Sequence, residues 1–426
     1  MREDLVQYVW QYQLFDKRNL LTECGEEINI IKPGFLNHES GPDFLQAQIQ
    51  LGEIIWFGAI EIHLKARDWH HHHHHHDPAY DNVILHVVWD KATEVTRNDG
   101  TTIPTLTLSS RVDQQLLKRY QLLTEQGLKK KVLSCSHFLQ YVPDIYKASA
   151  IEQASASRIE RKSKEILEMY QAHANDWHQT AFQSICRAYG FKTNASPFSQ
   201  LGAKISYRCL LKERNSFESI AGILLYASGL STQDNISDEL KKCAQHMAKK
   251  YDLVKVRMAP HEFKHFPVRP ANAPIVRIFQ LAALIYCQPG LYEMLSSTND
   301  LNIFYNLFDE ANRKLLASKS LTNKLSRLGK ESMQRIIINA VVPFRFAVAA
   351  THADEKHRES AIQLIENLPA ENNRYTKFFK KEGFTMQSAL ETQGAIEQHR
   401  FYCVKSQCLR CPVGTYIMKN HDLVVI

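Results

Sequence analysis

The sequence predicts an α+β protein, with a mixed α/β module around a β-hairpin followed by a mainly helical body. Apolar residues alternate with a period of two between about residues 28 and 108, and recur with helical spacing from about residue 113 onward. The net charge changes sign near the same place. Residues 1–125 contain 11 basic and 18 acidic residues, a net charge of −7, whereas the remainder carries +14. Half of the 20 histidines also lie in residues 1–125.

Length and composition limit the class of protein. The 426 residues suffice for two to four domains, and we expect a module at 1–125, a helical body at 126–397 and a cysteine-containing tail at 398–426. No apolar run approaches the ~18–20 residues of a membrane span. Glu3 and Asp4 lie where a signal peptide would be apolar, and the nine cysteines are scattered. The sequence therefore predicts a cytoplasmic protein without a disulfide framework and without a membrane.

The elements follow from these patterns. We expect a helix over residues 1–15 and a tight turn at Gly52-Glu53 that joins two strands into a hairpin. Pro104 predicts that the last strand lies at an edge of the sheet. The predicted strands are 28–32, 44–51, 54–64, 83–89 and 102–108. A helix is also predicted at 113–125, and the predicted helices of the body are 149–170, 217–228, 275–287, 301–316, 333–349 and 359–367.

The hairpin carries the first candidate site. Asp43 precedes one strand, and Glu61, His63 and Lys65 alternate along the next, so these three share one face. Two carboxylates of a hairpin are placed to hold Mg²⁺ or Mn²⁺ and an activated water. His63 or Lys65 would then orient that water or stabilise negative charge on a phosphate. The alternative is an amphipathic hairpin with a solvated polar face.

Seven consecutive histidines, 70 to 76, form the second candidate site. Imidazole is a common ligand of zinc, copper, iron and nickel. In an extended loop, His72 and His74 would face the same way, and Asp77 follows the tract. The alternative is a surface loop with incidental metal affinity. His86, inside an apolar strand, is predicted as a core histidine rather than a ligand.

The tail contains Cys403, Cys408 and Cys411. Their C-x4-C-x2-C spacing matches the first three ligands of a plant-type iron–sulfur protein, and thiolates equally suit zinc. Cys135 is the best candidate for a fourth ligand, and Cys24 or a histidine are the alternatives. The alternative is three reduced cysteines in a turn.

Arg269 and Arg277 form the last candidate site. Pro274 is expected to begin a helix, and Arg277 would project near its N-terminus, where backbone N–H groups attract anions. A phosphate contact and a purely structural loop are both compatible with this pattern.

The motifs together resemble an uncharacterised bacterial family, a domain of unknown function, over nearly the whole chain. In that family two histidines follow Asp-Trp, and His72 and His74 match them. The residues that carry the resemblance are Gly41-Pro42-Asp43-Phe44, Glu61-Ile62-His63, Asp68-Trp69, Asp77, residues 80–88, Arg269-Pro270-Ala271-Asn272 and Cys408-Leu409-x-Cys411.

The front module is also similar to the PD-(D/E)XK nuclease core. Pro42-Asp43 matches its first acidic position and Glu61 its second, whereas His63 replaces the usual lysine and Lys65 lies two residues further on. This resemblance implies a restriction-endonuclease-like fold and a metal at Asp43 and Glu61.

These observations lead to one main hypothesis and two alternatives. The main hypothesis is a metal-dependent nuclease or phosphodiesterase whose basic helical body binds DNA or RNA. The first alternative is a non-catalytic protein that binds metal and either nucleic acid or another protein. The second is a zinc-dependent hydrolase centred on His63, His72, His74 and Asp77.

Overall fold

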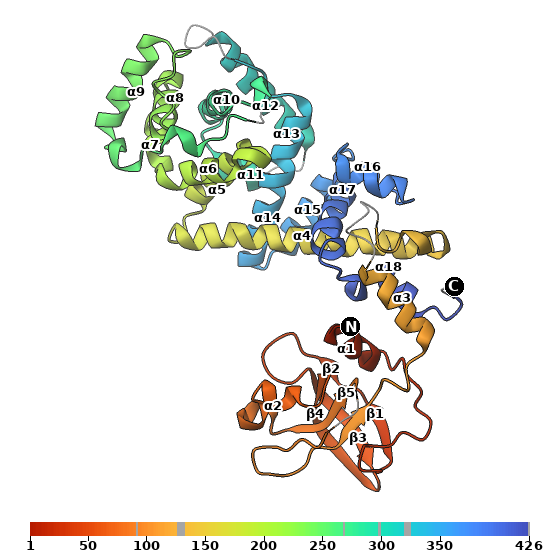
Figure 1. Ribbon diagram of the computed structural model, residues 1–426. Coiled ribbons are helices and arrows are strands. Elements are labelled where there is room, and N and C mark those ends of the chain that lie inside the picture. The colour runs from red at the N-terminus through yellow and green to blue at the C-terminus, as the bar shows by residue number, and fades with distance from the viewer. Residues whose placement is uncertain (91–92, 126–132, 267–268, 297–299, 319–324, 425–426) are drawn as a thin grey trace. The chain divides into compact units, whose positions relative to one another are not determined.

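The computed structural model describes residues 1–90, 93–125, 133–266, 269–296, 300–318 and 325–424. The predicted domain boundary after residue 125 lies next to residues 126–132, which are outside these ranges. The chain divides into two compact units: residues 1–150 with 381–384 and 398–426, and residues 151–380 with 385–397. The first unit contains a mixed sheet and the second is helical (Figure 1), so the α+β prediction is confirmed. A restriction-endonuclease-like arrangement of the sheet is not confirmed.

The sheet has the strand order β1-β3-β4-β5-β6, with β2 paired to β3. β3 and β4 form the predicted antiparallel hairpin, whereas β4, β5 and β6 run parallel. Pro104 directly precedes β6 at the edge of the sheet, as predicted. The strands are β1 (Ile28–Lys32), β2 (Phe35–Leu36), β3 (Phe44–Leu51), β4 (Ile54–His63), β5 (Val83–Val88) and β6 (Thr105–Thr107).

The C-terminal segment belongs to the first unit. Tyr8 Oη donates to Thr415 O at 3.4 Å, and the buried Arg119 donates from Nη1 to Leu423 O at 2.8 Å. The segment therefore packs against helices from the beginning and the end of the module. The helical elements of this unit are α1 (Glu3–Gln11), α2 (Asp68–His71), η1 (His74–His76), η2 (Pro78–Tyr80), α3 (Gln114–Glu125), η3 (Ser136–Tyr141), η9 (Gln398–Cys403), η10 (Cys408–Arg410) and α18 (Pro412–Lys419).

The second unit is built around two apolar helices, α8 and α10, whose residues are almost all buried. Each predicted helix of the body is present, with ends that differ by a few residues. The helices are α4 (Asp144–Ala172), which begins in the first unit, and then α5 (Trp177–Tyr189), α6 (Phe191–Lys204), α7 (Tyr207–Lys212), α8 (Phe217–Ala227), α9 (Asp238–Lys250), α10 (Pro274–Cys287), α11 (Leu291–Ser296), α12 (Leu301–Ala317), α13 (Lys330–Ile336), α14 (Val342–His352), α15 (Glu355–Glu366), α16 (Arg374–Lys381) and α17 (Ala389–Glu397). The shorter elements are η4 (Leu253–Val256), η5 (Pro260–Glu262), η6 (Pro270–Asn272) and the π-helical η8 (Ile337–Val341).

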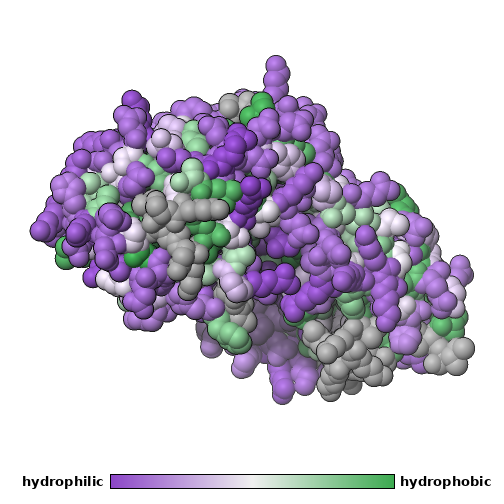
Figure 2. All heavy atoms as spheres, turned by 90° about the horizontal axis from the view of Figure 1, so that it is seen from above, coloured by the Kyte–Doolittle hydropathy of each residue, from purple (hydrophilic) through white to green (hydrophobic). Residues whose placement is uncertain are grey.

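One continuous helical stretch, Lys330–His352, is long and apolar enough by length and composition to cross a bilayer. It comprises α13, η8 and α14, and 72% of its most apolar window is buried inside the protein. Burial of this kind is also what a core helix shows. The face of the molecule in Figure 2 is mostly hydrophilic, with small scattered apolar groups.

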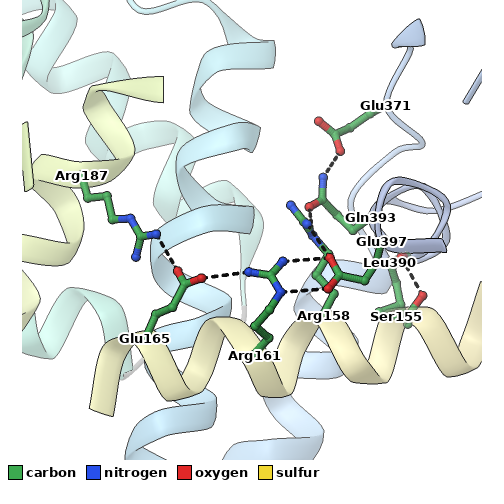
Figure 3. A network of polar contacts seen from close by, with 9 residues as sticks. All are labelled: Ser155, Arg158, Arg161, Glu165, Arg187, Glu371, Leu390, Gln393 and Glu397. Atoms are coloured by element: carbon green, nitrogen blue, oxygen red, sulfur yellow. Dashed lines mark hydrogen bonds and ion pairs between the residues drawn. The ribbon is translucent and has the colours of Figure 1, made fainter. Parts of the chain in front are cut away.

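A buried ion-pair network joins α4 to α17 (Figure 3). The Glu397 carboxylate accepts bonds from Arg158 Nη1 at 3.0 Å and from Arg161 Nε and Nη2 at 2.9 and 2.8 Å. Arg158 Nε also donates to Gln393 Oε1 at 2.6 Å. Glu397 is 2% exposed and Arg158 9%. The acidic partner, from a distant part of the sequence, thus buries part of the basic face of α4.

Gly394 lets the two helices of this network approach each other. A Cβ atom at this position would lie 2.2 Å from Ser155 Oγ and 2.4 Å from Ile151 O, closer than atoms tolerate. Ser155 Oγ donates to Leu390 O at 3.1 Å across the same contact. Only glycine fits between the backbones at this point.

Replacing this glycine should therefore destabilise the second unit. We expect Gly394→Ala to lower the free energy of unfolding by about 1–3 kcal/mol, because the added methyl group must push the helices apart. Denaturant titration measures the effect. Gly329→Ala is the matched control, since nothing lies within 4 Å of a Cβ atom there. Equal stability of both variants would contradict this packing.

Lys162, on α4, should make stability depend on pH. Burial, with repulsion by Arg158, lowers its pKa from 10.5 to about 8. At pH 7 the lysine is charged in both states, and the folded state bears the cost of burying that charge. Between pH 8 and 10.5 the unfolded state binds more protons, so the stability contribution of Lys162 rises with pH. We expect Lys162→Met to be more stable than the unaltered protein at pH 7 and to lose most of this advantage by pH 10. A pH-independent difference in the free energy of unfolding would refute the assignment.

Candidate metal centre

One face of β4 carries the predicted acidic and imidazole side chains. Glu61 and His63 alternate along the strand and point to the same side of the sheet. Glu61 lies opposite His86 in the parallel β4–β5 pair, and Asp43 directly precedes β3 on the other side of β4. Glu61, His63 and His86 are 5%, 1% and 0% exposed. Three neighbouring strands thus bring four ionisable groups together.

The two carboxylates are connected through the backbone. Asp43 N donates to Glu61 Oε2 and Ile62 N donates to Asp43 Oδ2, both at 3.0 Å. Asp43 Oδ1 accepts a 2.9 Å bond from Gln7 Nε2 of α1. Burial, reinforced by Glu61, raises the pKa of Asp43 to about 7, and burial raises the pKa of Glu61 to about 8. Two acidic groups in this position require a nearby positive charge to ionise fully.

His63 lies at the centre of the imidazole cluster. Its Nδ1 is 2.8 Å from His86 Nε2, and its Nε2 is 3.2 Å from His72 Nδ1. Glu61 Oε1 lies 3.6 Å from His63 Nε2 and 3.3 Å from His74 Nε2. One ring nitrogen from each of His63, His72 and His74 lies within 4.8 Å of the other two. Three nitrogen donors and one carboxylate oxygen therefore converge.

The contact with His86 fixes the orientation of His63. Burial, and then the neighbouring histidines, lower the pKa of His63 to about 2 and that of His86 to about 3. A neutral imidazole has one N–H group and one free lone pair. If His63 Nδ1–H donates to His86 Nε2, the lone pair of His63 Nε2 points into the cluster. Outer partners of this kind orient the histidine ligands of metals.

The histidine tract reaches the sheet through a reversal of the chain. α2 ends before His72, His73 has a left-handed φ of 61°, and η1 begins at His74. The predicted extended loop is therefore wrong. The reversal instead brings the two histidines on either side of His73 to the same partner, His63. The structure brings the predicted pair, His72 and His74, together through a different conformation from the predicted one.

Trp69 and Tyr80 hold the tract in place. The Trp69 side chain is fully buried, and its Nε1 donates to Thr96 O at 3.0 Å. Its ring lies edge-on to His74, with centroids 5.5 Å apart. Tyr80 stacks on the same imidazole at 3.8 Å and an interplanar angle of 25°. These contacts leave His74 little freedom to turn away from Glu61.

Lys65 and Asp77 lie at the border of the cluster. Lys65 is exposed and lies two residues beyond His63, where β4 ends, so the strand no longer directs its side chain. Asp77 is also exposed, and its Oδ1 accepts a 2.9 Å bond from Ala79 N at the start of η2. Its charge acts on His74 from there. The catalytic role predicted for Lys65 and the metal-ligand role predicted for Asp77 therefore stay predictions.

Two residues of α1 face the site without having been predicted. Gln7 bonds Asp43, and Glu3 lies four residues earlier on the same side of the helix. Burial, followed by repulsion from Asp43 and Asp68, raises the pKa of Glu3 to about 7. The sequence indicates this pair only through its spacing of four residues, on a helix whose buried residues are apolar apart from the Tyr8 hydroxyl and the Trp10 N–H. It could not show which strand the helix covers.

The predicted arginine pair takes a different arrangement. Pro274 does begin α10, but Arg277 is only 4% exposed and its guanidinium lies 4.2 Å from the Phe191 ring. Its Nη1 donates to Gln280 Oε1 at 2.7 Å. Arg269 is exposed. Arg277 is thus occupied by internal partners. The four predicted cysteines all lie in the first unit and are treated below.

Comparison with known proteins adds a family. Residues 3–374 match the family model described as "Protein of unknown function (DUF2851)". The chain belongs to this family. The searches of curated proteins and of solved structures returned no match. The predicted resemblance to a domain of unknown function is therefore confirmed over residues 3–374, whereas the likeness to PD-(D/E)XK nucleases is not supported.

The cluster should bind one transition-metal ion more tightly than the rest of the tract. We expect zinc titration against a competing chelator to show one tight site. The double change His72→Ala and His74→Ala should weaken it roughly 100-fold or more, because two ligands are lost. The double change His71→Ala and His76→Ala, in exposed positions of the same tract, is the control and should leave that site intact. An equal loss of zinc affinity in both variants would show that the tract binds metal without a specific site at His63, His72 and His74.

Proposed function

We propose that this protein is a metal-dependent hydrolase whose ion is held by His63, His72 and His74. The observation that carries this proposal is the convergence of their ring nitrogens beside Glu61 Oε1. Around a tetrahedral zinc ion with Zn–N bonds near 2.0–2.1 Å, ligand nitrogens stand about 3.3 Å apart. The 3.2 Å between His63 Nε2 and His72 Nδ1 fits such a site, and a nitrogen of His74 lies within 4.8 Å of both.

The donor set favours zinc, or another transition metal that accepts imidazole, over magnesium. Magnesium prefers oxygen ligands, and Asp43 already accepts bonds at both carboxylate oxygens. His63 is also held as a neutral imidazole, which suits a ligand. A residue that replaces the PD-(D/E)XK lysine would have to be positively charged. The low pKa of His63 keeps its imidazole neutral. The predicted Mg²⁺ or Mn²⁺ site at Asp43 and Glu61 is therefore the weaker proposal.

Glu61 is the residue best placed to move a proton. Bound at the cluster, the ion would supply an acidic water and polarise the scissile bond. Glu61 Oε1 lies beside two of the ligand nitrogens, and its other oxygen is fixed by Asp43 N. It would accept a proton at Oε1 and return it to the leaving group. Asp43 is a positioning residue, since it holds Glu61 from the backbone and is itself held by Gln7.

The charge distribution favours phosphodiesters of nucleic acid as the substrate class. The second unit contains 32 basic and 24 acidic residues, a net charge of +8, whereas the first contains 20 and 21. A basic body attracts a polyanion, and the acidic module alone would repel one. The competing proposal is a protein in which the same centre binds metal without catalysis.

An activity assay distinguishes the two proposals. DNA and RNA would be incubated with the protein and Zn²⁺, Mn²⁺ or Mg²⁺ in turn. We expect cleavage that Glu61→Gln lowers by about 10²–10⁴-fold, because loss of a general base costs that much. His71→Ala should cleave normally, since His71 is exposed outside the ligand set. Absence of cleavage with every metal, in protein that binds zinc tightly, would instead support the non-catalytic proposal.

A further inference from the structure

Four cysteines from two distant stretches of the chain meet in the first unit. Cys135 caps the start of η3, and Cys403 is the last residue of η9. Cys408 opens η10, and Cys411 caps α18. All four are free thiols, and Cys411 is 7% exposed while the others are partly buried. This cluster is separate from the histidine centre and does not depend on the proposed hydrolase activity.

The charges of all four thiols interact. Burial raises the pKa of Cys135, and the thiols of Cys403, Cys411 and Cys408 raise it further. The same mutual effect links Cys403 with Cys411 and Cys408, and Cys408 with Cys411. Burial raises the pKa of Cys408 to about 12. These mutual effects show that the four thiols lie near one another in the first unit.

The surrounding backbone is shaped for a sulfur ligand. Gln398 Nε2 lies 3.1 Å from Cys411 Sγ, and the N–H groups of Val413 and Gly414 at the start of α18 also face this sulfur. A Cβ atom on Gly414 would lie 2.0 Å from Cys408 O, so only glycine permits this close turn. Hydrogen-bond donors that point at a cysteine sulfur stabilise its thiolate and alter the redox potential of a bound metal centre.

We propose that Cys135, Cys403, Cys408 and Cys411 hold an iron–sulfur cluster. The arrangement fits a cluster better than a single zinc ion. Zn–S bonds of 2.3 Å place the sulfurs of a tetrahedral site about 3.8 Å apart. Among the described residues, the donors that all lie within 4.8 Å of one another belong to His63, His72 and His74, not to three of these cysteines. In a cluster each cysteine binds at a different corner, so the sulfurs stand further apart.

The cluster would fasten the end of the chain to its beginning. Arg2 Nη2 donates to Ser406 O at 3.1 Å, between two of the cysteines in sequence. Cys408 Sγ lies 3.5 Å from Leu123 O of α3. The ligands thus lie where α1, α3 and the C-terminal segment meet, and the centre has a structural role at this junction.

Anaerobic purification tests the proposal. The full-length protein, isolated without immobilised metal, should contain iron and acid-labile sulfide in equal amounts and show the broad visible absorption of a cluster. Cys135→Ser and Cys408→Ser should each lose most of the sulfide, whereas Cys24→Ser, an exposed cysteine outside the set, should keep it. The double change His72→Ala and His74→Ala should also keep it, which separates this centre from the histidine site.

The unaltered protein decides the matter even if a cysteine variant fails to fold. Stoichiometric zinc without sulfide, remaining in the His72→Ala and His74→Ala protein, would overturn the iron–sulfur assignment. So would protein that contains no sulfide after reconstitution with iron and sulfide under anaerobic conditions. A disulfide between any two of the four cysteines in anaerobically isolated protein would equally overturn it.

Discussion

The burial of Glu61 and His63 in one strand is the constraint on which the first unit depends. An ionisable pair inside a sheet costs several kcal/mol unless each group finds a partner. The neighbouring strands supply two of these partners, the backbone of Asp43 and the ring of His86. The open side of the pair is closed by the histidine tract. The fold of residues 68–80 is thus a consequence of what β4 buries.

Helix α1 links this centre to the end of the chain. Gln7 on one side of the helix bonds Asp43, whereas Arg2 and Tyr8 bond the segment that carries the cysteines. A nine-residue helix has little stability of its own and takes its position from its contacts. Any change that loosens the C-terminal segment should therefore reach the partners of Asp43 through α1. The two clusters are far apart in sequence but share this one support.

Local patterns were sufficient for some parts of this arrangement and not for others. Alternation along β4 correctly placed Glu61 and His63 on one face, because that property needs only neighbouring residues. The partnership of His63 with His86 depends on the register of a parallel pair across a long excursion, which no local pattern contains. The helix predicted over residues 1–15 ends at Gln11, since the chain turns to a positive φ at Gln13. The left-handed conformation of His73 could not be predicted either, because all of its neighbours in the tract are also histidines.

The exposed histidines around the built cluster have a practical consequence for handling the protein. Several imidazoles on one loop bind immobilised nickel, so the unmodified chain should adhere to nickel resin without any added tag. Nickel binds nitrogen sites more tightly than manganese, iron or cobalt does. Passage over such a resin would replace a more weakly bound native ion with nickel, and the metal then found in the protein would not be the native one. The metal that the cell supplies is therefore best identified in material that has never touched a chelating column.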